Sequence, residues 1–304
     1  MKNIINIIAN GNDFFQLALK GKRLTHWVLI LPVIIITVLL SVYIFAISAD
    51  IIFGVSEEFN YYKTTYITTG MFVGIALFII LWARYFEKRK FYTLGFTKEN
   101  ALKKYLKGFG LGILLSSAVV GLMAIFGGVE VVLNPENSHM LKITIIVSLV
   151  IFILQGASEE ILFRGWLMQV LGAKYKPIVG IIATLILFTV FHASNSGFNL
   201  LVAVNITLIA IIIILLVLDG KNLWAASGFH SSWNWAYCNI FGFTISGSDQ
   251  KEFGASVLSL KGVGGTFLGG GDFGPEGSIM TTIVCVISIV FLYWMQSRKN
   301  EVRS

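Results

Sequence analysis

The chain has 304 residues, of which 56% are hydrophobic and 13% are charged, and its formal net charge is +7. Soluble domains carry about 25% charged residues, so this composition excludes an ordinary soluble protein. The apolar residues form long blocks, which favours membrane-spanning helices over the short alternating strands of a barrel. Basic residues flank these blocks, so we interpret the positive charge as loops facing the cytoplasm and not as a nucleic-acid surface.

A polar, amphipathic lead over residues 1–26 precedes the first apolar block, which begins near Trp27. That block is long enough to cross a bilayer, so a cleaved signal is not expected here. The lead contains the stretch NIINIIANGNDFFQLALKGKRL. Two interpretations of it stay open: a segment lying on the inner membrane surface, or a partly ordered tail.

Eight apolar blocks approach or exceed the roughly 20 residues that a helix needs to cross a bilayer core. They lie at about 27–49, 66–85, 108–127, 142–171, 177–193, 199–218, 222–244 and 278–296. The fourth block is longer than a single crossing and contains charged residues, and the fifth is short. The sequence therefore predicts an all-α, polytopic membrane protein with about eight transmembrane helices.

Lysine and arginine are concentrated in alternate loops, which sets the expected orientation. Basic segments precede the first span, follow the second, fourth and sixth, and follow the eighth. Both termini are therefore predicted to be cytoplasmic. A single transmembrane domain is expected over 27–297, followed by a short tail over 298–304.

The longest loop on the opposite side, about 244–277, is rich in glycine and serine. Its run GVGGTFLGGGDFGPEG lacks the GK[ST] ending and the preceding strand of a phosphate-binding loop. The composition predicts a flexible loop outside the membrane and suggests a lid.

Ionisable groups within a bilayer are costly, and they mark candidate functional sites. Six polar residues remain at membrane depth once loop residues are set aside: Glu159, Glu160, Arg164, His192, His230 and Asn234. Glu160 and Arg164 are four residues apart, so they can pair on one side of a helix. Glu159 is rotated by about 100° from Glu160 and is expected to face a different neighbour.

The depth of these residues follows from their distance to the turns. Glu159 and His192 flank the turn at 172–177, and at 1.5 Å per residue both lie about 20–25 Å above it. His230 is nearer to its own turn and reaches only about 15 Å, so a tilt or a deeper turn is needed to bring it level.

Two chemistries suit a site with one carboxylate, two imidazoles and a carboxamide. In the first, Glu159, His192 and His230 bind Zn²⁺, which activates a water molecule. In the second, a carboxylate and a histidine activate the water directly, while the remaining groups stabilise the oxyanion. Structural alternatives also stay open, because the Glu160–Arg164 pair can be a clamp and intramembrane polar groups can join helices or conduct ions.

Three motifs on successive spans carry a resemblance to a known family. Glu159-Glu160-x-x-x-Arg164, Phe188-x-x-x-His192 and His230-x-x-x-Asn234 together resemble the CPBP intramembrane proteases. This family, also called Abi, comprises CAAX proteases and bacteriocin-processing enzymes and includes the eukaryotic Ras-converting endopeptidase. The resemblance covers residues 142–244.

The resemblance implies peptide-bond hydrolysis in a cavity among the motif helices. Glu159 would activate water or bind a metal, Glu160 would support it with Arg164, and Phe188 would pack the site. His192 and His230 would be ligands or acid–base groups, and Asn234 an oxyanion donor.

The implied substrate is a membrane-embedded or lipid-modified peptide or protein, and the chain resembles the bacterial branch of the family, so a bacterial plasma membrane is expected. A non-catalytic immunity or scaffold protein and a transporter remain the alternative functions.

Overall fold

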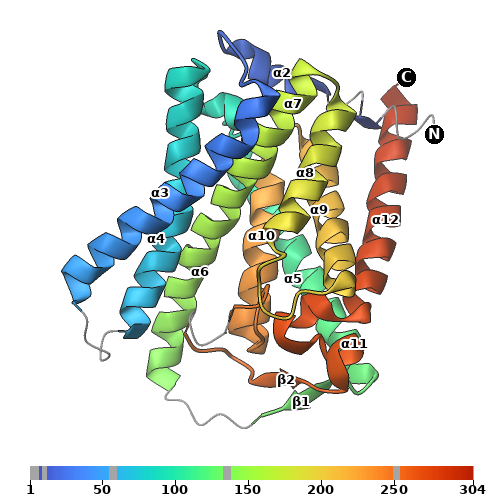
Figure 1. Ribbon diagram of the computed structural model, residues 1–304. Coiled ribbons are helices and arrows are strands. Elements are labelled where there is room, and N and C mark those ends of the chain that lie inside the picture. The colour runs from blue at the N-terminus through green and yellow to red at the C-terminus, as the bar shows by residue number, and fades with distance from the viewer. Residues whose placement is uncertain (1–6, 9–11, 55–59, 133–137, 249–253, 304) are drawn as a thin grey trace.

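The computed structural model describes residues 7–8, 12–54, 60–132, 138–248 and 254–303, which form a helical bundle with one small sheet (Figure 1). The principal helices are α3 (Trp27–Phe53), α4 (Asn60–Leu81), α5 (Ala101–Ile125), α6 (Ser138–Glu160), α8 (Pro177–Phe191), α9 (Leu200–Gly220), α10 (Trp224–Trp235) and α12 (Ile279–Arg303). Shorter helical segments are α2 (Asn12–Gln16), η1 (Leu17–Lys20), η3 (Trp82–Phe86), η4 (Phe91–Leu94), η5 (Ile161–Met168), α7 (Gln169–Lys174), η6 (Ala236–Phe241), α11 (Gly265–Gly269), η8 (Gly271–Phe273) and η9 (Pro275–Gly277).

Six helices within the described ranges are long and apolar enough to cross a membrane. They are Trp27–Phe53, Tyr62–Phe86, Ala101–Ile125, Ile143–Lys174, Leu200–Gly220 and Ile279–Lys299. These six coincide with predicted blocks, which confirms an all-α, multi-pass membrane protein. The two other predicted spans correspond to α8, with 15 residues, and α10, with 12 residues. The count of eight crossings therefore stays a prediction.

Some helices extend beyond the apolar blocks. Helix α5 begins at Ala101, although its apolar block begins only near residue 108. The extra turns contain Lys103 and Lys107, which are exposed. Hydropathy marks the part of a helix that the bilayer can hold, and polar turns continue past it because helical hydrogen bonding does not require apolar side chains.

Both ends of the described chain lie at the same end of the bundle. Figure 1 shows α2, α7 and the C-terminal end of α12 at one end of the bundle, with the sheet and α11 at the opposite end. An ion pair joins Lys221 to Asp13 there, and Lys299 Nζ lies 2.9 Å from both carboxylate oxygens of Asp219. This arrangement suits an even number of crossings. The cytoplasmic placement of that end rests on its basic residues and stays a prediction.

The second half of the N-terminal lead is packed against the bundle. Phe14 and Phe15 are fully buried in α2, which contacts α7. A side chain added at Gly172 in α7 would overlap the ring of Phe15, so the two segments are in close contact. Residues 12–20 of the lead are therefore ordered, because two buried aromatic rings anchor them. Residues 1–6 and 9–11 of the lead lie outside the described residues.

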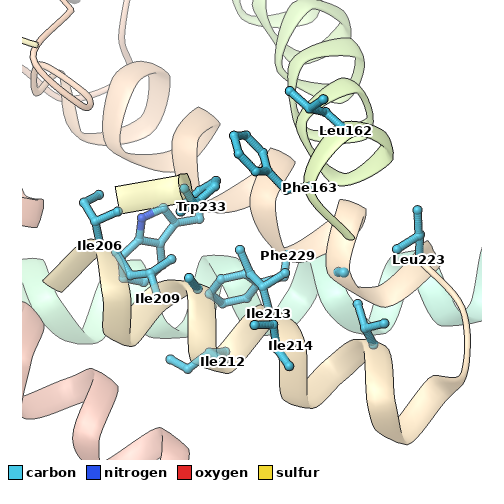
Figure 2. Packing of buried hydrophobic residues seen from close by; sticks show 14 of the residues in the cluster. Leu162, Phe163, Ile206, Ile209, Ile212, Ile213, Ile214, Leu223, Phe229 and Trp233 are labelled. Carbon is cyan, nitrogen blue, oxygen red and sulfur yellow. The ribbon is translucent and has the colours of Figure 1, made fainter. Parts of the chain in front are cut away.

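Helix α10 is the inner helix of the bundle and packs against α5, α6 and α9. Figure 2 shows Phe229 and Trp233 from α10 meeting the isoleucines of α9, among them Ile209. Gly228 allows the close approach of α5, because a Cβ atom at this position would overlap the Tyr105 carbonyl oxygen. Small residues at helix contacts let backbones approach closely in membranes. The third motif therefore lies on a tightly held helix.

The glycine-rich segment is folded where it is described. Strand β1 (Val129–Val131) pairs antiparallel with β2 (Leu260–Gly262), and α11, η8 and η9 follow. Gly274 adopts φ +85°, a conformation that favours glycine, where the chain turns beside the Thr244 carbonyl. The expectation of a flexible loop is thus corrected for residues 254–277, because this segment forms a strand and short helices and is buried at 269–270 and 273–277.

Candidate active site

A cavity of about 260 Å³ lies between α4, α6, α8 and α10 and is bounded by the chain at 245–248. Four of the six predicted site residues line it, namely Glu159, His192, His230 and Asn234. The other lining residues are Thr68, Met71, Phe72, Gln155, Phe191, Asn195, Ile245, Ser246 and Ser248. The structure therefore brings the three predicted motifs to one place.

The adjacent glutamates face different surroundings. Glu159 is 8% exposed and lines the cavity, where Gln155 Nε2 donates to its Oε1 at 3.3 Å. Within the described structure, Glu159 Oε2 has no hydrogen-bond partner. Glu160 is 0% exposed and lies behind the cavity wall. The rotation of about 100° between neighbours on a helix separates the two carboxylates.

The buried Glu160 carboxylate bridges two of the other motif residues. Arg164 Nη1 donates to Glu160 Oε1 at 3.0 Å, and His230 Nδ1 lies 2.9 Å from the same oxygen. A carboxylate accepts hydrogen bonds, so the His230 Nδ1 atom must carry the proton. His230 Nε2 then faces Glu159, whose Oε2 lies 3.7 Å away. The two glutamates thus contact the two nitrogens of one imidazole.

Arg164 is fully buried and has an aromatic partner as well as a carboxylate. Its guanidinium carbon lies 4.3 Å from the centroid of the Phe188 ring. The Phe188 carbonyl oxygen in turn lies 2.8 Å from His192 Nδ1. Phe188 therefore contacts His192 of its own motif through its backbone, and it contacts Arg164 of the first motif through its ring. The attraction of a carboxylate and of an aromatic ring offsets part of the free-energy cost of removing the Arg164 guanidinium from water.

His230 reaches the level of the glutamates because its helix begins deep in the bundle. Leu223 is fully buried, and its backbone N–H donates to the Gly95 carbonyl at 3.0 Å. The Trp224 indole donates to the Thr97 carbonyl at 2.6 Å. The chain around Gly95 therefore covers the start of α10. The contact between His230 and Glu160 places the imidazole level with the glutamates.

His192 lies at the end of its helix and is held by the turn that follows. It is the C-cap of α8. The backbone N–H of Asn195 donates to the His192 carbonyl at 3.1 Å, and the Asn195 side chain donates to the Ser246 carbonyl at 2.8 Å. The position of His192 therefore depends on contacts outside its own helix.

The predicted zinc ligands do not form a metal site as they are placed. In the described part of the chain, no group of three or more His, Cys, Asp or Glu side chains is arranged to hold a metal ion. His230 Nε2 faces Glu159, and the contact of His192 Nδ1 with the Phe188 carbonyl leaves the Nε2 atom of His192 available as a ligand. One carboxylate and two imidazoles at one cavity are donor types that suit zinc, so a Zn²⁺ ion held by Glu159, His192 and His230 stays a prediction, and we derive no step of the reaction from it.

Three residues near the site were missed by the sequence reasoning. Gln155 precedes Glu159 by four residues on the same helix, so its spacing is a usable signal. Asn195 follows His192 by three residues in a turn. Ser246 lies in the glycine- and serine-rich segment and offers no local signal, because only the fold brings that segment to the cavity.

Residues 141–236 match the family model of Rce1-like type II CAAX prenyl endopeptidases. This match confirms the resemblance to CAAX proteases that the three motifs predicted. It contains all six predicted site residues and covers less than half of the chain. Searches of curated proteins and of solved structures gave no match.

Proposed function

We propose that the chain is an intramembrane endopeptidase that cuts a peptide bond of a membrane-embedded or lipid-modified peptide or protein in a bacterial plasma membrane. One observation carries the proposal: an acceptor oxygen of Glu159 and a ring nitrogen of His230 meet beside a cavity in a multi-pass helical bundle. The match to a protease family supports the same reaction class. Asn234 adds an amide at the same cavity.

Glu159 is the proposed general base. A water molecule bound beside Glu159 Oε2 gives a proton to that oxygen while its own oxygen attacks the scissile carbonyl carbon. The tetrahedral intermediate then collapses and the C–N bond breaks. The amine leaves with the proton that Glu159 took from water, relayed through His230 Nε2. Asn234 stabilises the negative oxygen of the intermediate with an amide N–H.

Glu160 and Arg164 are proposed to orient the acid–base groups. Glu160 accepts a hydrogen bond from the Nδ1–H group of His230. The Nε2 atom of His230 is therefore directed at the cavity and at Glu159. Arg164 supplies a positive charge beside Glu160, and this charge offsets the repulsion between the two neighbouring carboxylates. The substrate meets a partly apolar wall formed by Met71, Phe72 and Phe191, which suits a membrane peptide.

Replacing His230 by glutamine tests this proposal. We expect kcat for cleavage to fall by about 100-fold, because glutamine cannot exchange a proton with Glu159 or with the leaving amine. Purified protein is reconstituted with membrane peptides from a strain that lacks it, and the products are read by mass spectrometry. His26→Gln is the matched control, since His26 is exposed and lies outside the cavity lining.

The outcomes separate the alternatives. Equal cleavage by the His230→Gln variant and the parent would contradict the assigned site. A parent protein that cuts no membrane peptide, together with a cellular phenotype that survives Glu159→Ala, would favour the immunity or scaffold function. A substrate flux abolished by Glu159→Ala would favour a transporter.

Metal removal is a separate prediction. Cleavage is expected to be unchanged after dialysis against excess EDTA, because the proposed mechanism activates water with Glu159 and uses no metal ion. The measurement is kcat before and after dialysis, with metal content determined by mass spectrometry. Loss of activity that added Zn²⁺ restores would instead show that Glu159, His192 and His230 rearrange around zinc.

A further inference from the structure

Glu276 is a buried carboxylate outside the three motifs and outside the family match. It is 3% exposed and belongs to η9 in the glycine-rich segment. The Trp233 indole donates to its Oε1 at 2.9 Å. Ser246 donates to its Oε2 twice, from the backbone N–H at 3.1 Å and from the hydroxyl at 2.7 Å. Both carboxylate oxygens of Glu276 therefore accept hydrogen bonds.

The two residues that contact Glu276, Ser246 and Trp233, are each linked to a segment that carries a histidine of the site. Ser246 accepts a hydrogen bond from Asn195, whose backbone N–H donates to the His192 carbonyl. Trp233 lies on α10 between His230 and Asn234. A single carboxylate thus joins the turn that holds His192 to the helix that holds His230.

Glu276 is itself held firmly in place. The Asn205 side chain in α9 donates to the Glu276 carbonyl at 2.7 Å and to the Ser278 carbonyl at 2.9 Å. The Thr282 hydroxyl donates to the Asn205 side-chain oxygen at 2.6 Å. The backbone of Glu276 is therefore hydrogen-bonded to Asn205 of α9, which is itself hydrogen-bonded to Thr282 of α12, and this holds the Glu276 side chain in position.

We propose that Glu276 is a positioning residue that fixes the position of His192 relative to His230. The catalytic consequence of this role rests on the proposed function. His192 needs such support because it is the C-cap of α8, directly after the last helical residue, and lies where helical hydrogen bonding ends. The glycine-rich segment then has a specific role, because its turns place one carboxylate against Ser246 and Trp233.

The test is Glu276→Gln, which keeps the size of the side chain and one acceptor oxygen. Its amide nitrogen cannot accept from Ser246, so the Ser246–Asn195 contact loosens while the Trp233 contact can persist. We expect kcat to fall by about 10- to 100-fold with little change in KM, as misplacement of a reacting group predicts. Ser246→Ala removes one of the two donors and is expected to lower kcat less.

Glu87→Gln is the matched control at the other end of the bundle. Glu87 is also fully buried, and it accepts from a tryptophan indole, Trp166, and from the backbone N–H and hydroxyl of Thr25. It also pairs with Arg89, at 3.1 Å. This variant is expected to lower the melting temperature while the kcat of the folded protein is unchanged.

A second readout does not depend on peptide cleavage. Diethyl pyrocarbonate modifies accessible imidazoles, and mass spectrometry reports the rate at each histidine. His192 is expected to react several-fold faster in Glu276→Gln than in the parent or in Glu87→Gln, while exposed His26 reacts equally in all three. Unchanged reactivity of His192 would overturn the proposal, and so would a kcat of Glu276→Gln equal to that of the parent. Faster labelling of His192 in a protein that cuts no peptide would reject the protease function and retain the positioning role.

Discussion

Glu159→Gln is expected to lower kcat for peptide cleavage by about 10⁴-fold while the protein remains folded. Glutamine has the same shape as glutamate but cannot take a proton from water. The change removes little structural support, because Glu159 Oε2 has no hydrogen-bond partner within the described structure and Gln155 contacts the other oxygen. The loss should therefore appear in kcat and not in the melting temperature.

The measurement compares single-turnover cleavage by the parent, Glu159→Gln and Glu130→Gln, with thermal unfolding of each in detergent. Glu130 is exposed on β1 and serves as a glutamate outside the cavity lining. A Glu159→Gln variant that retains more than about a tenth of parental kcat would remove Glu159 from the role of general base. If Glu160→Gln alone lost activity under those conditions, the two glutamates would exchange roles.

Arg164→Met is expected to destabilise the fold by about 3–5 kcal/mol, because it leaves the Glu160 carboxylate buried without its cation. Glu160 and Arg164 are both 0% exposed, and their atoms lie 3.0 Å apart. Methionine fills much of the arginine volume, so the effect reports the missing charge more than a cavity. His230 is expected to shift as well, since it shares the same carboxylate oxygen.

The double variant Glu160→Gln/Arg164→Met separates charge from packing. It removes both charges and is expected to recover part of the stability lost in Arg164→Met, measured as the fraction folded after heating in detergent. A double variant less stable than either single variant would contradict the interpretation of an ion pair. Arg164→Met as stable as the parent would show that Glu160 needs no cation in this environment.

The local geometry of the motifs was predictable from the sequence. The spacing of Glu160 and Arg164 predicted a pair on one helix side, and the structure contains it. The rotation between Glu159 and Glu160 predicted different neighbours. The two carboxylates do face the cavity and the interior, but both contact His230, each at a different ring nitrogen. Such predictions succeed because the α-helix has a fixed rotation and rise per residue.

Contacts between distant segments were not predictable in the same way. The chain near Gly95 covers the start of α10, and hydropathy does not reveal this contact. Phe15 anchors the N-terminal lead through a close contact with Gly172, far away in the chain. Glu276 gave no signal, since a carboxylate in a glycine-rich segment is ordinarily a solvated loop residue.

The order of residues along the chain is enough to establish a multi-pass helical bundle with three polar motifs at membrane depth. Long apolar blocks and helical spacing are local properties, and the bilayer makes them decisive because it penalises every exposed polar group. Two contacts emerge only when the chain is folded: Glu160 shares His230 with Glu159, and Glu276 connects His192 to α10. Both depend on how helices and loops pack, and packing joins residues whose separation in the chain carries no periodic signal.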